Sequence, residues 1–251
     1  YNLEISHAEM KSIVDCLSLK FHTINKNNKI FPIQEAFNYN FFHYDEACVS
    51  TLKDFEDIKN SKEGIKFLLD STNYSIKIFE NQMKNNEYVN GFFRYKKYTR
   101  EDTLRILMWE KMEVPLNLGG YKLNTKLNNM PVWVTLHKAD DITETQKYSD
   151  EFINSERFSW QTKNSRDLNS PEVLAIKRQS KTGLDIPFFL KKSDSEDDEE
   201  FYFLGYLFAD VGSINQGFIE NQKGDEKSIV NIDFKLDKPV ETSLYDYLIE
   251  N

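Results

Sequence analysis

The chain has 251 residues, of which 39% are hydrophobic and 14% aromatic, which is enough for one large domain or two small ones with a packed core. No run approaches the roughly 18 consecutive apolar residues that a membrane-spanning helix needs, so we expect a cytoplasmic protein that does not contact a membrane. The net charge of −9 argues against a polyanionic partner only if charge is spread evenly along the chain.

Charge is in fact distributed unevenly. Residues 1–90 carry 10 Lys and no Arg against 13 acids, and residues 193–251 carry 4 basic residues against 15 acids. Residues 91–192 carry 18 basic residues against 13 acids and contain all six arginines, Arg94, Arg100, Arg105, Arg157, Arg166 and Arg178. Because guanidinium donors suit phosphates and base edges, this segment is a candidate anion-facing surface. Ordinary solvated salt bridges are the alternative.

The first 90 residues have a helical pattern. Ser6 and Glu9 form a capping-box sequence ahead of apolar residues at helical spacing. Further helical stretches are predicted at 44–52, 61–69 and 76–79. We therefore predict a small helical bundle over residues 1–90, which serves as a connector domain. Since the chain starts at Tyr1 without an initiator Met, we also expect it to be a piece of a longer protein.

Residues 91–251 change to short β-branched and aromatic runs that are typical of strands. These runs lie at 121–123, 131–136, 158–162, 187–190, 201–208 and 229–236. One helix is predicted at 170–177, with Ser170 as N-cap and Pro171 in the first helical position. The acidic run 193–200 indicates a solvated loop. The predicted fold class is α+β, a helical bundle followed by a β-barrel-like domain with flanking helices.

Motifs for catalysis are missing. The sequence has no Walker-type phosphate loop and no HExxH, GxSxG or GxGxxG. His137–Lys138 lacks the spacing of a phospholipase-D-type nuclease motif, and Glu172 with Lys177 is only a weak metal-nuclease pair. The two cysteines have no zinc-binding spacing. We predict no catalytic and no metal-binding residues in this chain.

A dense aromatic and polar stretch lies in the basic segment. The stretch has two pieces, residues 147–152 and 158–166. If both are extended, Tyr148, Asp150 and Phe152 share one face, and Phe158 and Trp160 share another. Two aromatic faces with a carboxylate between them suit a base pocket, where rings sandwich the base and the carboxylate accepts from an exocyclic amine. The alternative is that the aromatics fill the barrel core and Asp150 caps a turn. The residues alone leave both interpretations open.

Several segments resemble a known family in their order along the chain. They are 98–102 (YTRED), 117–121 (NLGGY), 131–138 (PVWVTLHK), 148–152 (YSDEF), 158–162 (FSWQT) and 170–172 (SPE). This order is similar to the C-terminal SRA-like domains of SauUSI-type restriction enzymes, which are bacterial, type IV, ATP-dependent and modified-cytosine-dependent. The resemblance covers roughly residues 92–250.

The resemblance implies an SRA-like/PUA-like barrel over residues 91–251 that recognises 5-methylcytosine or 5-hydroxymethylcytosine in double-stranded DNA by base flipping. It implies a non-catalytic target-recognition part of a restriction endonuclease whose nuclease and helicase domains lie elsewhere in the same chain. No cofactor is expected here, whereas ATP and Mg are expected for the full-length enzyme. Two alternatives stay open: an interaction or assembly domain whose acidic run 193–200 contacts a basic partner, and a stand-alone nuclease.

Site residues follow from the stretch and the resemblance together. Asp150 is the candidate acceptor for the cytosine amine, and Phe152 or Phe158 would hold the methyl group. Gly119 and Gly120 would let the backbone approach the base, or else form a tight turn. The predicted base pocket comprises Tyr148, Asp150, Phe152, Phe158, Trp160, Gly119, Gly120 and Tyr121. The predicted DNA-backbone contacts are Lys122, Lys138, Lys163, Asn164, Arg166 and Arg178.

Overall fold

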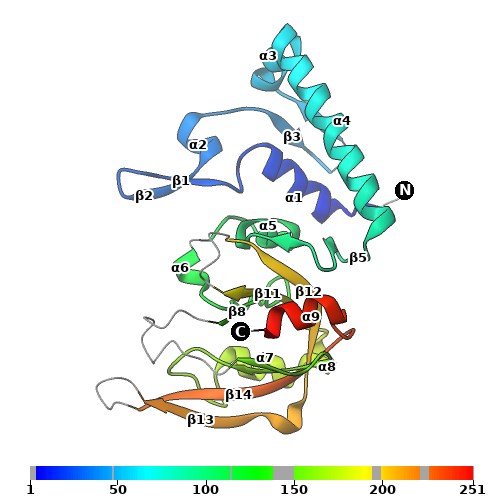
Figure 1. Ribbon diagram of the computed structural model, residues 1–251. Coiled ribbons are helices and arrows are strands. Elements are labelled where there is room, and N and C mark those ends of the chain that lie inside the picture. The colour runs from blue at the N-terminus through cyan, green and yellow to red at the C-terminus, as the bar shows by residue number, and fades with distance from the viewer. Residues whose placement is uncertain are drawn as a thin grey trace. The chain divides into compact units, whose positions relative to one another are not determined.

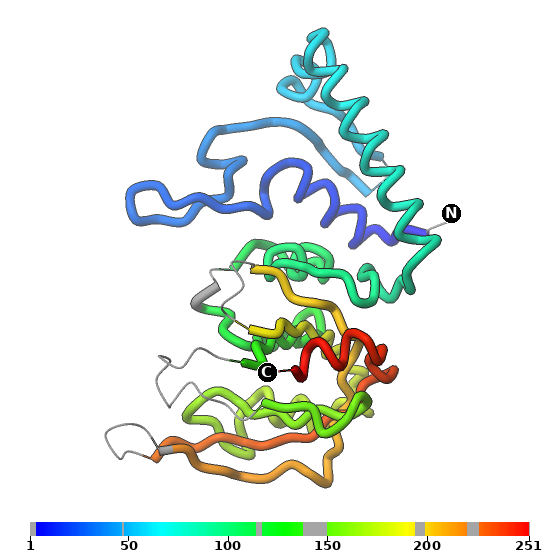
Figure 2. Tube along the Cα trace, in the orientation of Figure 1, coloured from blue at the N-terminus to red at the C-terminus, as the bar shows by residue number. Residues whose placement is uncertain are grey.

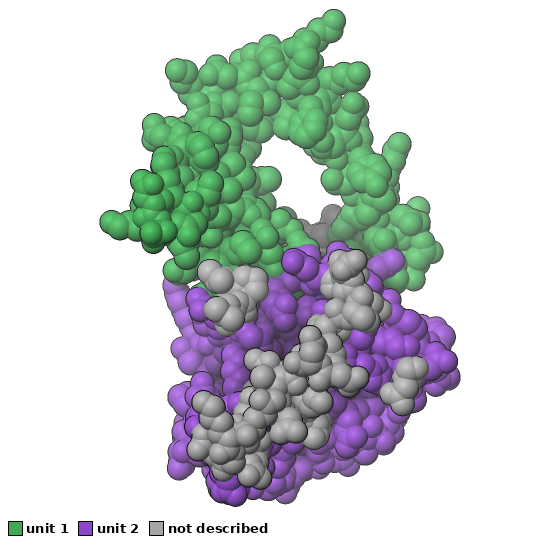
Figure 3. Space-filling view, turned by 60° about the vertical axis from the view of Figure 1, so that its left-hand side comes forward, with its two compact units in different colours: residues 1–93, 101–114 green, residues 94–100, 115–251 purple. Residues whose placement is uncertain are grey.

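A computed structural model describes residues 4–46, 48–113, 115–137, 150–193, 199–220 and 226–250. The chain divides into two compact units (Figure 3). Unit 1 comprises Tyr1–Phe93 and Glu101–Val114, and unit 2 comprises Arg94–Arg100 and Pro115–Asn251. The units therefore interleave in sequence, whereas the sequence pattern placed one boundary near residue 90.

Unit 1 begins with a helix where the capping box predicted one. Helix α1 (His7–Leu17) begins at the predicted capping box, since Ser6 Oγ accepts from Glu9 N at 3.2 Å and Glu9 Oε2 accepts from Ser6 N at 2.8 Å. The stretches predicted at 61–69 and 76–79 belong to one long helix, α4 (Lys62–Asn85) (Figure 1). The other helices are α2 (Ile33–Phe37), α3 (Lys53–Asn60) and α5 (Arg100–Ile106).

The helix predicted at 44–52 is wrong, because this stretch lies in the antiparallel pair β3 (Phe42–Tyr44) and β4 (Val49–Thr51). Val49 and Thr51 are β-branched and favour strands, and Asp45 Oδ1 accepts from Cys48 N at 3.0 Å across the turn. Two further hairpins complete unit 1, β1 (Thr23–Lys26) with β2 (Lys29–Pro32) and β5 (Tyr88–Val89) with β6 (Phe92–Phe93). Unit 1 is mixed rather than purely helical.

Unit 2 is built on an eight-stranded, barrel-like sheet, which confirms the predicted α+β class (Figures 1 and 2). Its main path runs β8 (Val132–His137), β11 (Pro187–Ser193), β12 (Phe201–Ala209), β14 (Glu226–Leu236), β10 (Arg157–Gln161), β9 (Glu151–Asn154). Only β8 and β11 pair in parallel along that path. Strand β7 (Lys97–Tyr98) joins β12, and β13 (Asn215–Glu220) joins β14. Strands predicted at 131–136, 158–162, 187–190, 201–208 and 229–236 are confirmed, whereas of 121–123 only Tyr121 forms a β-bridge, to Val132.

Short helices flank the sheet of unit 2. They are α6 (Pro115–Leu118), α7 (Pro171–Lys177), α8 (Gln179–Thr182) and α9 (Thr242–Ile249). Helix α7 confirms the helix predicted at 170–177, including Ser170 as N-cap residue and Pro171 in the first turn. Residues 194–198 of the acidic run lie outside the described residues. In the part of the chain that the structure describes, no helix is long and apolar enough to cross a membrane.

A buried ion pair fastens the start of unit 2 to its sheet. Arg94 is 3% exposed and donates to Asp237 through both terminal nitrogens, at 3.1 and 2.5 Å, and to Leu204 O at 2.7 Å. Gly205, with φ of +123°, lies directly against this pair, and a Cβ there would be 2.1 Å from Arg94 Nη1. Only glycine therefore fits at this position.

Candidate functional site

The predicted pocket aromatics of β10 lie in the core of unit 2. Phe158 and Trp160 are 0% and 2% exposed, as the alternation of a strand with one buried face requires. The ring of Phe158 contacts those of Phe152 and Phe188, with centroids 5.1 and 4.8 Å apart. Trp160 contacts Tyr121 edge-on at 4.9 Å. These rings fill the sheet interior, as the core alternative of the sequence analysis anticipated.

Asp150 lies just before β9 and its carboxylate faces the neighbouring strand. Oδ1 accepts a hydrogen bond from the backbone N of Gln161 at 3.0 Å. Phe152, the next predicted pocket residue, is half-buried and packs between Phe158 and Tyr245. Tyr148 lies outside the described residues. The structure thus gives Asp150 a strand-capping contact, and its role as base acceptor stays a prediction.

Four predicted or nearby polar residues do come together, and we call them the Tyr121 cluster: Tyr121, Lys163, Arg166 and Glu172. Glu172 Oε1 accepts from Tyr121 Oη at 2.9 Å and from Arg166 Nε at 2.6 Å. Lys163 Nζ donates to the carbonyls of Leu118 and Tyr121, both at 2.7 Å. The same ammonium lies 4.5 Å from the centroid of the Tyr121 ring. Three separate segments of the sequence therefore build one hydrogen-bonded group.

The local backbone explains how these segments meet. Gly119 has φ of +56°, and a Cβ on it would lie 3.0 Å from Lys163 Cε, so glycine lets the lysine side chain lie across the turn. Gly120 O accepts from Trp133 N at 2.7 Å, which ties the turn to β8. Tyr121 then enters the core at 4% exposure. Glu172 lies in the first turn of α7, where a carboxylate interacts favourably with the helix dipole.

Burial and neighbouring charges together shift the pKa values of three members of the cluster. Desolvation, and then the Glu172 carboxylate, raise the pKa of the Tyr121 hydroxyl well above its usual range, so the hydroxyl stays a donor at neutral pH. Desolvation, and then the Arg166 charge, lower the pKa of the Lys163 ammonium. Burial acts to lower the pKa of Arg166, but Glu172 and Tyr121 outweigh it and raise that pKa. A charged guanidinium is thereby held in place by a nearly buried carboxylate.

The cluster offers both donors and an acceptor to a ligand. The Arg166 side chain is 40% exposed and that of Glu172 is 10% exposed. Among the described residues, no hydrogen bond goes to the second carboxylate oxygen, Glu172 Oε2. The site therefore combines a fixed, solvent-reaching cation with one carboxylate oxygen that can accept.

The other predicted DNA-backbone residues are placed differently. Lys122 and Asn164 are half-buried and directly follow Tyr121 and Lys163 in sequence. Arg178 is exposed but lies at the opposite end of α7 from Glu172. Lys138 falls outside the described residues. The structure thus brings Gly119, Gly120, Tyr121, Lys163 and Arg166 together and leaves Arg178 apart.

Glu172 is the residue that the sequence analysis did not assign to the site. It was weighed only as half of a metal-nuclease pair with Lys177, but Lys177 Nζ instead donates to Leu168 O at 3.0 Å. Among the described residues, no three His, Cys, Asp or Glu side chains gather as metal ligands. The available signal was its position at the start of a predicted helix, directly after Ser170 and Pro171.

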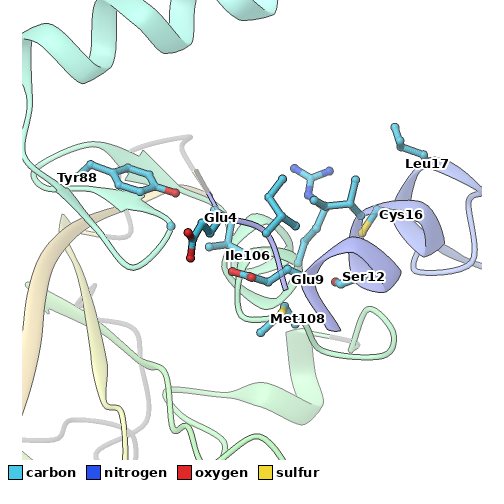
Figure 4. Close-up of a pocket in the computed structure, with 12 residues that line it drawn as sticks. Glu4, Glu9, Ser12, Cys16, Leu17, Tyr88, Ile106 and Met108 are labelled. Atoms are coloured by element: carbon cyan, nitrogen blue, oxygen red, sulfur yellow. The ribbon is translucent and has the colours of Figure 1, made fainter. Parts of the chain in front are cut away.

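Unit 1 contains a cavity of about 530 Å³ beside α1 (Figure 4). Its wall combines apolar residues with Glu9, Cys16, Tyr88 and Arg105. None of the predicted site residues within the described ranges lines it. This cavity is distinct from the Tyr121 cluster.

Comparison with known proteins gives one family and several remote structures. Residues 92–248 match the family described as "Domain of unknown function (DUF3427)". No curated protein matches the sequence. Among solved structures, the chain is similar to the DNA recognition domain of the cytosine modification-dependent restriction endonuclease LpnPI, with 12% identity and a TM-score of 0.36 over 49% of this chain and 63% of that one.

Two structures of KRYPTONITE are also similar, one in complex with mCHG DNA and SAH, the other with mCHH DNA, an H3(1-15) peptide and SAH. Both have 10% identity over 66% of this chain, with TM-scores of 0.33 and 0.32. The chain spans 63% of the LpnPI structure and only 38% and 37% of the KRYPTONITE structures, less than two thirds of each.

Proposed function

The chain belongs to the DUF3427 family, whose description assigns no activity, and we propose that its unit 2 binds double-stranded DNA carrying 5-methylcytosine or 5-hydroxymethylcytosine. The observation that carries the proposal is the Tyr121 cluster, in which a fixed guanidinium and an accepting carboxylate lie side by side. The cluster lies in the segment that holds all six arginines. The ordered motifs that resemble SauUSI-type recognition domains support the same function.

Phosphate binding is the first part of the proposal. Arg166 is oriented by its 2.6 Å hydrogen bond to Glu172, so less side-chain entropy is lost when it binds an anion. Lys163 and Asn164 lie on the same segment as Arg166, and Lys122 directly follows Tyr121, the residue that shares the Glu172 carboxylate with Arg166. Such contacts position the protein on the duplex without reading sequence.

Base recognition is the second part. We propose that the modified cytosine is flipped out of the duplex and received beside Tyr121, where Glu172 Oε2 accepts from the exocyclic amine. Unstacking costs a few kcal/mol, which a charge-assisted hydrogen bond and ring contacts offset. Glu172 Oε2 favours this location over a pocket built on β10, because no described residue donates a hydrogen bond to it.

The parent protein is the third part. We propose that this chain is the non-catalytic target-recognition part of a restriction endonuclease, whose nuclease and helicase domains lie in the same polypeptide and use Mg and ATP. The motif order that resembles SauUSI-type enzymes supports this architecture. Purifying the full-length protein and assaying methylated plasmid with and without ATP tests it.

Two experiments test the binding function itself. A gel shift with methylated and unmethylated duplexes, in the presence of magnesium, should show a shifted band for methylated DNA and no cleavage. Cleavage by this chain alone would indicate a nuclease, and no binding would leave an assembly domain.

The second experiment places 2-aminopurine beside the modified cytosine. If the base is extruded, the fluorescence of the 2-aminopurine should rise when the protein binds, because unstacking relieves quenching.

A further inference from the structure

Helix α4 of unit 1 exposes apolar side chains along much of its length. Its 24 residues include no buried one. Leu69 and Ile76 are 55% and 51% exposed, and Ile65 is 36% exposed. A helix with this much apolar surface is normally covered by another protein surface.

The apolar residues follow a heptad repeat. Six positions spaced alternately by four and three residues are Ile65, Leu69, Thr72, Ile76, Phe79 and Met83. All but Thr72 are apolar, and we call this row the α4 seam. A four-three spacing is typical of a helix that packs along its length against another helix. At its C-terminal end the seam meets its own unit, since Phe79 contacts the rings of Tyr88 and Phe93.

We propose that the α4 seam pairs with the α4 seam of a second copy of this chain, in antiparallel orientation. In that orientation every seam residue faces a seam residue of the other copy. Ile65 faces Met83, Leu69 faces Phe79, and Thr72 faces Ile76. The two-fold axis crosses the helices at the level of residue 74, which is midway between the two members of each pair. Each of the three pairs therefore occurs twice in the dimer.

Charges flanking the seam favour this register. Lys66, Asn73 and Glu80 occupy the same flanking position of successive heptads. In the antiparallel pair Lys66 faces Glu80 of the other copy on both sides of the axis, and Asn73 faces its own equivalent. A parallel pair would instead place Leu68 opposite Asn73 and Ser75 opposite Glu80, with no opposite charges in contact.

Lys66 and Glu80 cannot pair with each other within one chain. Fourteen residues of helix separate Lys66 and Glu80 by about 21 Å, too far for an ion pair. Among the described residues neither side chain forms an ion pair, and both residues are exposed. They are therefore available to a second copy.

The first test is the molar mass of the 251-residue chain, measured by light scattering after size-exclusion chromatography over a range of loading concentrations. The proposal predicts a species of twice the chain mass of 29.7 kDa at high concentration. Ile76→Glu should raise the dimer dissociation constant at least about tenfold, because it places two carboxylates next to the axis. Tyr74→Glu is the matched control, since Tyr74 is 68% exposed and lies off the seam. Circular dichroism checks that both variants fold.

Charge exchange and cross-linking fix the orientation. Lys66→Glu and Glu80→Lys should each weaken the dimer, and the double variant should restore it. In a Cys48→Ser background, Asn73→Cys should form a disulfide-linked dimer, whereas Ser71→Cys, which lies off the seam, should not. A chain that stays monomeric at all concentrations, or a dimer that Tyr74→Glu dissociates and Ile76→Glu does not, would overturn the proposal and assign the seam to another part of the parent protein.

Discussion

Tyr121 and Glu172 are 51 residues apart in sequence, yet the tyrosine hydroxyl donates to the Glu172 carboxylate at 2.9 Å in the interior of unit 2. Through this hydrogen bond the turn after α6 is joined to the first turn of α7. Arg166 donates to the same carboxylate oxygen from the loop that follows β10. The stability of the site and its proposed function therefore depend on the same contacts.

Replacing Tyr121 by Phe should destabilise the protein by about 1 to 3 kcal/mol, because a buried carboxylate loses a donor. The hydroxyl also accepts from Lys163 N at 3.3 Å, and that amide loses its acceptor. Urea denaturation measures the effect. Tyr202→Phe is the control, since the Tyr202 hydroxyl has no hydrogen bond with any described residue and its removal should cost less than about 0.5 kcal/mol. Equal midpoints for the two variants would contradict the prediction.

The contribution of Tyr121 should also depend on pH. Burial and Glu172 raise its pKa in the folded state above the value near 10 of an unfolded chain. Its stabilising effect is therefore fully present below about pH 10 and is lost as pH rises toward the folded-state pKa. The difference in unfolding free energy between wild type and Tyr121→Phe should therefore be constant below about pH 10 and shrink as pH rises above it. The lowered pKa of Lys163 acts in the opposite direction, but it is common to both proteins.

Gly119→Ala tests the close approach of Lys163. The substitution forces a Cβ into a left-handed turn, at about 1 to 2 kcal/mol, and places it 3.0 Å from Lys163 Cε. Gly183→Ala is a matched control, because Gly183 has φ of +65° with nothing within 4 Å of an added Cβ. We expect Gly119→Ala to lower both the melting temperature and DNA affinity, and Gly183→Ala to lower only the former. Unchanged affinity in Gly119→Ala would remove the turn from the binding site.

Arg166→Ala should weaken binding to methylated and unmethylated DNA by the same factor. It should also reduce the slope of log affinity against log salt by about one unit, as expected for one lost phosphate contact. Lys235→Ala, an exposed lysine of β14, is the control and should change neither quantity. Each variant is compared after its cooperative melting is confirmed. A loss confined to methylated DNA would make Arg166 a base-reading residue instead.

Much of unit 2 could be predicted from the sequence, because short β-branched and aromatic runs with a buried face are distinctive. The Ser6–Glu9 capping box and Ser170–Pro171 likewise located α1 and α7. The stretch 44–52 was misassigned since its apolar spacing fits a helix about as well as a strand, whereas the structure has an antiparallel pair here with Cys48 N donating to Asp45 Oδ1 between the strands. The return of Glu101–Val114 to unit 1 has no local sequence signal.

The candidate site could be predicted only in part. Arginine clustering pointed to Arg166, and glycine doubling pointed to Gly119 and Gly120. The alternation within β10 shows that Phe158 and Trp160 share one face of the strand. It could not decide whether that face lines a base pocket or the core, because aromatic side chains suit both. The position of Glu172 after Ser170 and Pro171 predicts only a helix start, because its contacts to Tyr121 and Arg166 are created by the folded chain.

The most direct test of the account is the ratio of two dissociation constants. Fluorescence anisotropy would measure binding of the 251-residue chain to two duplexes that differ only in the 5-methyl group of one cytosine, at a single stated salt concentration. The account predicts at least several-fold tighter binding to the methylated duplex, and a ratio that falls toward one in folded Glu172→Gln. Equal affinity of the wild-type chain for both duplexes would contradict it.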